Sequence, residues 1–161
     1  AGADGIFFCE DLGTQDRVLI GPSMWREIFA SHYQRLCSTA HAYGMKVIMH
    51  SCGYNWELID DLIDNGIDCL QFDQPAAYDQ EGLSSKLQER GVGLWSPVDI
   101  QRIMPTGDRQ LIESEARRMV QTYRGGLIMG NYGDIQGIGI QAEWDDWAYY
   151  AVLDEIGIDA P

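Results

Sequence analysis

The chain has 161 residues, 45% of them hydrophobic and 22% charged, and it carries a formal net charge of −14 at pH 7. This length and composition suffice for one globular domain with a substantial core. The negative charge argues against nucleic acid or an anionic membrane as a partner, although a small anionic substrate remains compatible with it.

The cysteine pattern and the N-terminal residues bear on the cellular compartment of the protein and on how the chain begins. Four cysteines at irregular spacing, without a CxxC pair, are typical of a reduced cytoplasmic enzyme. No apolar run reaches the roughly 20 residues of a membrane helix, and the N-terminus has no signal-peptide pattern. Residues 1–4 resemble a helix end that runs into a strand, so we expect the chain to begin within a fold.

Short apolar runs alternate five times with longer segments of helical periodicity. The apolar runs predict buried parallel strands at residues 5–10, 46–50, 68–72, 92–96 and 126–130. The longer segments predict helices over residues 22–44, 56–65, 81–90, 109–123 and 143–155. In the first helix the apolar stripe is expected to consist of Trp25, Phe29, Tyr33, Leu36 and Ala40.

Five consecutive βα units without a linker predict one α/β domain with a parallel sheet. Two architectures fit this pattern: a doubly wound open sheet and part of a (β/α)8 barrel, because periodicity does not report closure. A whole barrel needs about 250 residues, so this chain would supply about five of its eight units.

In either architecture the active site lies beyond the C-terminal ends of the strands. Side chains that bind metals or substrates follow each predicted strand, which favours an enzyme, although loops are polar in most proteins. The candidates, in chain order, are Glu10, Asp11, His50, Cys52, Gln74, Asp99, Gln101, Asn131 and Tyr132.

His50 and Cys52 are two positions apart at a strand end, so their side chains point to the same side. An imidazole and a thiolate in that arrangement can share a zinc ion, while the alternative is a buried pair without metal. A zinc site needs at least three protein ligands. Glu10 or Asp11 is the expected third donor, because the other cysteines lie within predicted strands or a helix.

Asp11 and Asp99 are the candidate catalytic carboxylates. Each could act as general acid or base or hold a polar group of the substrate. The alternative is that each caps the turn or helix that follows it, which Asp does well.

An ordered set of motifs runs through the chain: EDLGTQ at residues 10–15, GPSMWRE at 21–27, AHAYGMKV at 40–47 and HSCG at 50–53. Gln74–Pro75 and VDIQ at 98–101 extend the set. It resembles the C-terminal half of the uroporphyrinogen decarboxylase superfamily, and most of all its branch of cobalamin-dependent methyltransferases. The resemblance implies a (β/α)8 TIM barrel, of which residues 1–161 are the C-terminal portion, with the N-terminal part of the barrel as a partner.

In that branch, an H-x-C motif and a later cysteine after the last strand hold a zinc ion. The zinc lowers the pKa of a thiol substrate, and the thiolate takes a methyl group from a corrinoid. His50 and Cys52 match the first two ligands, whereas no cysteine lies near Tyr132, so an acidic residue would replace the third. The implied cofactors are zinc and a corrinoid, the latter as a substrate or on a partner protein.

Three functions are therefore open. The leading hypothesis is zinc-thiolate methyl transfer, and the first alternative is decarboxylation of uroporphyrinogen or a related carboxylated substrate. Uroporphyrinogen decarboxylases use no metal and do not typically carry H-x-C-G, which argues against that activity. The second alternative is an accessory subunit that binds ligand without catalysis. The assignments are Asp11 and Asp99 as catalytic, His50 and Cys52 as metal ligands, and Glu10, Gln74, Gln101, Asn131 and Tyr132 as substrate-binding residues.

Overall fold

The computed structural model describes residues 2–159, in which strands and helices alternate as the sequence predicts. Its single sheet consists of β1 (Gly5–Cys9), β2 (Lys46–His50), β3 (Cys69–Gln71), β4 (Gly93–Ser96) and β5 (Leu127–Met129). The α-helices are α1 (Pro22–Ile28), α2 (Ala30–Ala42), α3 (Ile59–Asp64), α4 (Gln80–Arg90), α5 (Arg109–Thr122) and α6 (Ala142–Glu155). Short 3₁₀ turns are η1 (Trp56–Leu58), η2 (Pro75–Ala77) and η3 (Met104–Thr106).

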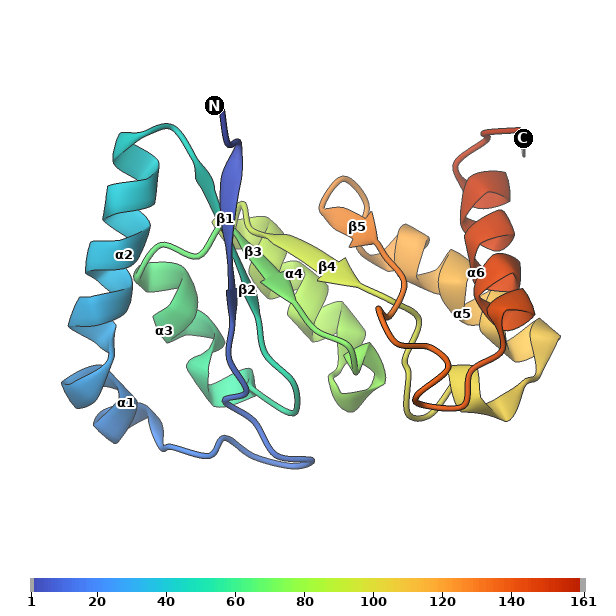
Figure 1. Cartoon of the computed structure of the whole chain (residues 1–161), viewed down its shortest axis with the longest axis horizontal. Coiled ribbons are helices and arrows are strands. Elements are labelled where there is room, and N and C mark those ends of the chain that lie inside the picture. The colour runs from blue at the N-terminus through green and yellow to red at the C-terminus, as the bar shows by residue number, and fades with distance from the viewer. Residues whose placement is uncertain (1, 160–161) are drawn as a thin grey trace.

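The order of the strands distinguishes the two architectures that the sequence leaves open. All neighbouring strands pair in parallel, and the order β1-β2-β3-β4-β5 follows the chain. A doubly wound sheet reverses its order at a switch point, whereas a barrel adds each new strand beside the last. The helices follow one another around the sheet in the same order (Figure 1), as in the outer layer of a barrel segment.

The first predicted helix is in fact two, and its expected apolar stripe is wrong at one position. The backbone breaks at Phe29 between α1 and α2. Leu36 is 49% exposed, and Cys37 is buried in its place. A Cβ atom on Gly66 would lie 2.7 Å from the Cβ of Cys37, so this small side chain lets α2 approach the turn after α3 closely. Leu36 is thereby turned toward solvent.

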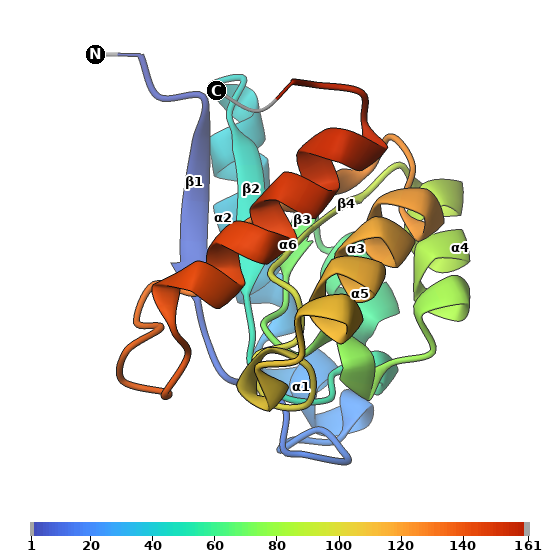
Figure 2. The same ribbon diagram turned by 90° about the vertical axis from the view of Figure 1, so that its right-hand side faces the viewer.

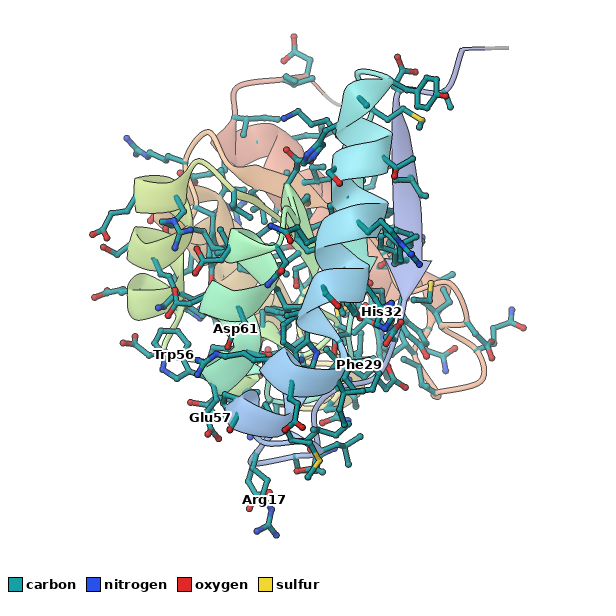
Figure 3. All side chains as sticks on the ribbon, turned by 90° about the vertical axis from the view of Figure 1, so that its left-hand side faces the viewer. Arg17, Phe29, His32, Trp56, Glu57 and Asp61 are labelled. Carbon is teal, nitrogen blue, oxygen red and sulfur yellow. The ribbon has the colours of Figure 1, made fainter. Side chains whose placement is uncertain are left out.

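Two hydrophobic clusters fill the space between the sheet and the helices. The larger one joins β1–β4 to α1–α4, and the smaller one joins the loops after β4 and β5 to α5 and α6. Figure 2 shows α5 and α6 side by side, and both helices contribute residues to this smaller cluster. Asp61 of α3, labelled in Figure 3, accepts a hydrogen bond from Arg26 Nε of α1 at 2.6 Å, which ties the two helices together by an ion pair. No helix within residues 2–159 is both long and apolar enough to cross a membrane.

Successive residues of β2 alternate between the helix layer and the opposite face of the sheet. Val47 and Met49 are fully buried in the larger cluster, whereas Ile48 and His50 belong to the other face and are only partly buried. This is the period of two that a β-strand imposes. We call the face that carries Ile48 and His50 the inner face, because it corresponds to the interior of a barrel.

The inner face is concave and carries large apolar side chains. The rings of Phe7 on β1 and Trp95 on β4 have their centroids 5.6 Å apart, although two strands lie between them. Three strand spacings in a flat sheet would amount to about 14 Å, so the sheet must curl to bring these rings together. Phe7 is 46% exposed and Ile128 on β5 is 50% exposed, which leaves much of the inner face open to solvent.

We predict that the 161-residue chain, prepared alone, self-associates. The outer edges of β1 and β5 are unpaired within residues 2–159, and they flank an exposed apolar face. Size-exclusion chromatography with light scattering should detect oligomers, and Phe7→Lys with Ile128→Lys should reduce them. The matched control is Tyr43→Lys, which removes an 80% exposed ring at the end of α2. A sharply melting monomer would contradict the prediction.

Candidate functional site

Three potential metal ligands converge where β1 and β2 end. His50 is the last residue of β2, Cys52 follows it by two positions, and Asp11 lies in the loop after β1. Each of the three offers one ligand atom, and these atoms all lie within 4.8 Å of one another. We call this group the Asp-His-Cys cluster. The structure thus brings together the predicted pair and one of the two acidic residues expected to complete it.

The spacing within the cluster fits a small divalent cation. His50 Nε2 lies 3.5 Å from Cys52 Sγ and 3.5 Å from Asp11 Oδ1. Ligand atoms at zinc bond lengths of about 2.0–2.3 Å in a tetrahedron lie roughly 3.3–3.8 Å apart. Nitrogen, sulfur and oxygen donors are also the set that zinc accepts most readily. The residues therefore fit a zinc ion in both separation and chemistry.

Glu10 does not belong to this cluster, and the structure lends no support to its predicted substrate-binding role. Strand alternation assigns Glu10 to the side of Phe8, which packs against the helix layer, and assigns Asp11 to the inner side. Burial raises the pKa of the Tyr33 phenol on α2, and the nearby Glu10 carboxylate raises it further. Glu10 is thus directed at the helices, away from the inner face.

Two glycines let the loops after β1 and β2 touch. A Cβ atom on Gly53, whose φ is +80°, would lie 2.5 Å from the backbone of Gly13. A Cβ atom on Gly13 would in turn lie 2.7 Å from the Tyr54 nitrogen. The Tyr54 amide donates a hydrogen bond to the Thr14 carbonyl at 2.7 Å, which joins the two loops. Only glycine leaves room for this approach.

The loop contact aligns the ligands themselves. The backbone amide of Cys52 donates a hydrogen bond to Asp11 Oδ1 at 3.1 Å. The Leu12 amide donates to Ser51 Oγ at 3.0 Å, so each loop is bonded to the other on both sides of the cluster. Asp11 is consequently held against His50 and Cys52 although about 40 residues separate them in the chain.

The electrostatics of the cluster favour a cation. Burial raises the pKa of Cys52 to about 11, and the negative charges of Asp11 and Asp73 add to that effect. The thiol is therefore protonated at neutral pH when no cation is bound. A divalent cation would reverse this balance, because it favours the thiolate and neutralises the carboxylates around it.

Gln74 lies beside the cluster, as expected for a residue of the site, and it is buried. Its Oε1 accepts a hydrogen bond from the Gly53 amide at 2.9 Å, and its Nε2 lies 3.9 Å from Cys52 Sγ. The side chain thus holds the loop after β2 and donates toward the thiol at the same time.

Asp99 caps a turn, and the structure lends no support to its predicted catalytic role. The residue is 0% exposed. Its carboxylate accepts hydrogen bonds from the amides of Ala76 at 3.0 Å, Gln101 at 2.9 Å and Arg102 at 2.6 Å. Both oxygens are satisfied by backbone donors, which is the capping alternative that the sequence left open. The side chain of Gln101 is exposed to solvent, outside this network.

Asn131 and Tyr132 line a cavity of about 290 Å³ between the end of β5 and the start of α6. Its floor is apolar and includes Met104 and Met129, and Asp145 lies at its side. Burial raises the pKa of the Tyr132 phenol, and the charges of Asp73, Cys52 and Asp11 raise it further. Tyr132 thus lines the cavity, and its phenol lies within range of the charges around the Asp-His-Cys cluster.

Sequence reasoning missed Gln71 and Asp73, which lie next to His50. Both are buried, and Gln71 is the register partner of His50 on the neighbouring strand. The available signal was the i, i+2 spacing of two polar residues at a strand end, the same spacing that singled out His50 and Cys52. The other two histidines lie outside the site: His32 is exposed on α2 (Figure 3) and His41 pairs with Asp68.

The fold and the site together define a barrel-type α/β protein whose functional residues gather at the C-terminal ends of parallel strands. The family model for uroporphyrinogen decarboxylase (URO-D) matches residues 1–133, the greater part of the chain. The chain belongs to the uroporphyrinogen decarboxylase family. No curated protein sequence matches it.

A methyltransferase from Methanosarcina mazei has a similar solved structure, with a TM-score of 0.72 over 97% of this chain and 20% sequence identity. This likeness confirms the fold that the resemblance implied, a partial (β/α)8 barrel. The chain spans 43% of the length of that protein.

We predict that Gly53→Ala lowers the affinity for zinc, whereas the same substitution at Gly125 lowers only the stability of the fold. Gly53 and Gly125 both have φ near +80°, at +80° and +77° respectively, so alanine strains the backbone at either position by roughly 1 kcal/mol or more. Only at Gly53 would the added Cβ also collide with a facing loop, since nothing lies within 4 Å at Gly125.

The measurement compares zinc affinity and urea unfolding for Gly53→Ala and Gly125→Ala. Gly53→Ala should lower zinc affinity at least about tenfold, as expected when groups that orient metal ligands are displaced. Gly125→Ala should lower the free energy of unfolding and leave the zinc affinity unchanged. Equal zinc affinities in the two variants would show that the loop contact does not position the ligands.

Proposed function

We propose that this chain forms the metal-binding part of an enzyme that transfers a methyl group between a corrinoid and a zinc-bound thiol. The observation that carries the proposal is the Asp-His-Cys cluster, with nitrogen, sulfur and oxygen ligand atoms within 4.8 Å at the strand ends. Membership of the uroporphyrinogen decarboxylase family and the fold shared with a methyltransferase agree with it.

In this proposal His50 Nε2, Cys52 Sγ and Asp11 Oδ1 hold the zinc. Bound there, zinc lowers the pKa of a substrate thiol and so supplies a nucleophilic thiolate at neutral pH. Asp11 serves as the third ligand, in place of the cysteine that the methyltransferase branch has and this chain lacks. A carboxylate carries the same single negative charge as a thiolate, so the charge of the ligand set is unchanged by the replacement.

The surrounding residues complete the substrate site. Asn131 and Tyr132 would bind the substrate from the cavity of about 290 Å³, a volume suited to a small molecule. Gln74 would act through its amide, which lies 3.9 Å from Cys52 Sγ and keeps the thiolate hydrogen-bonded. Asp11 acts as a ligand in this scheme and needs no separate acid–base role.

Two partners follow from the same proposal. The remaining strands of the barrel would cover the inner face, where Phe7 and Ile128 are half-exposed. A corrinoid protein would then dock at the C-terminal ends of the strands, because the thiolate must meet the methyl group there.

The second candidate function is decarboxylation of a carboxylated substrate, which the family match favours. Such a substrate needs cationic partners for its carboxylates. The cavity between the end of β5 and α6 is instead lined by Asp145 and Asp146, and neither Lys nor Arg lines it among the described residues. The charge of the cavity therefore favours the first proposal.

The first experiment is zinc analysis of the full-length protein and its variants. We expect about one zinc per chain, because three protein ligands define a single site. His50→Ala and Cys52→Ser should each abolish stoichiometric binding, and Asp11→Asn should weaken it while Asp11→Cys retains it.

Cys9→Ser is the matched control for Cys52→Ser. Cys9 is an exposed thiol on β1, paired in register with His50, but it is not part of the cluster. Zinc content measured after dialysis should be unchanged in this variant. Folded wild-type protein that takes up no zinc, even when zinc is offered, would exclude the mechanism and leave decarboxylation or an accessory role.

The second experiment separates the two enzymatic functions. We expect the zinc-loaded protein to demethylate methylcobalamin in the presence of a thiol, which absorbance reports directly, and Cys52→Ser to lose this activity. A decarboxylase would release carbon dioxide from its substrate without added metal. Carbon dioxide release that persists in Cys52→Ser, without methyl transfer by the wild type, would support the second candidate.

A further inference from the structure

The ring of His50 has a second contact that the proposed zinc site does not use. Its Nδ1 is hydrogen-bonded to Oε1 of Gln71 on the neighbouring strand β3. The two residues are register partners, and both side chains lie on the inner face. Nδ1 thus faces Gln71 while Nε2 faces Asp11 and Cys52.

The orientation of the Gln71 amide is fixed from its other end. Its Nε2 donates a hydrogen bond to Asp73 Oδ1 at 2.7 Å, and both residues are buried. An ionised carboxylate only accepts hydrogen bonds, so the amide nitrogen must face Asp73 and the amide oxygen must face His50. An amide oxygen also only accepts, so the hydrogen of the His50–Gln71 bond belongs to Nδ1.

We propose that Asp73 and Gln71 form a relay that fixes His50 as the Nδ1–H tautomer, with the lone pair of Nε2 directed at the metal position. Gln71 and Asp73 are therefore positioning residues that prepare His50 before any metal arrives. The inference rests on the proposed zinc site for its purpose, but the tautomer itself is a property of the metal-free protein. Groups of this kind typically contribute 10–100-fold to metal affinity.

The test is long-range ¹H–¹⁵N NMR of the metal-free, full-length protein at about pH 8.5, where an imidazole is neutral. The wild type should show His50 protonated on Nδ1, and Gln71→Leu should lose this preference. Zinc affinity, measured by chelator competition, should fall about 10–100-fold in Gln71→Leu.

Two pairs of variants separate positioning from stability. Asp73→Asn offers Gln71 a donor as well as an acceptor and should weaken the tautomer preference, and Asp73→Leu, which frees the amide to rotate, should abolish it. Gln80→Leu is the control for Gln71→Leu, because Gln80 is also a buried amide bonded to a carboxylate, that of Glu115 between α4 and α5. It should leave both the tautomer and zinc affinity unchanged.

The outcomes distinguish this inference from the proposed function. Wild-type His50 protonated on Nε2 would overturn the relay even if zinc binds. The Nδ1–H tautomer in a protein that binds no zinc would support the relay and reject the zinc mechanism. An unchanged tautomer and zinc affinity in Gln71→Leu would also overturn the inference, because the amide would then not position the ring.

Discussion

The contact between the backbones at Gly13 and Gly53 is the constraint on which the candidate site depends. Ligands on two different strands meet only if the loops after those strands touch, and here a single Cβ atom on either glycine would prevent it. The loop after β2 is fixed independently, because Asn55 Nδ2 and the Tyr78 hydroxyl both donate to the Gly53 carbonyl, at 2.9 Å and 2.8 Å. The site is therefore built from backbone geometry first and from side chains second.

Strand alternation then decides which polar residues enter the site. The same period of two that buries Val47 and Met49 against the helices turns His50 to the inner face. Gln71, on the neighbouring strand, is turned the same way and so meets the imidazole. Chemistry and stability are thus divided between the two faces of the sheet, and a residue on one face can change without disturbing the other.

This division explains how much the sequence could predict. Apolar runs and helical periods follow directly from burial, so the strands, the helices and the inward direction of His50 and Cys52 were predictable. The order of the strands was not, since periodicity is the same in an open sheet and in a barrel. The surroundings of Asp99 were not predictable, because an aspartate after a strand looks the same in sequence whether it faces a substrate or three backbone amides.

The proposed third ligand differs from that of the branch the chain resembles, where it is a cysteine after the last strand. In the proposed site the third ligand atom comes instead from Asp11, whose Oδ1 lies 3.5 Å from His50 Nε2, in the loop after the strand adjacent to β2. All three proposed donors then follow neighbouring strands, and the proposal assigns no ligand to the loop after β5. Tyr132 occupies that loop and lines the cavity between β5 and α6, in which the proposal seats the substrate.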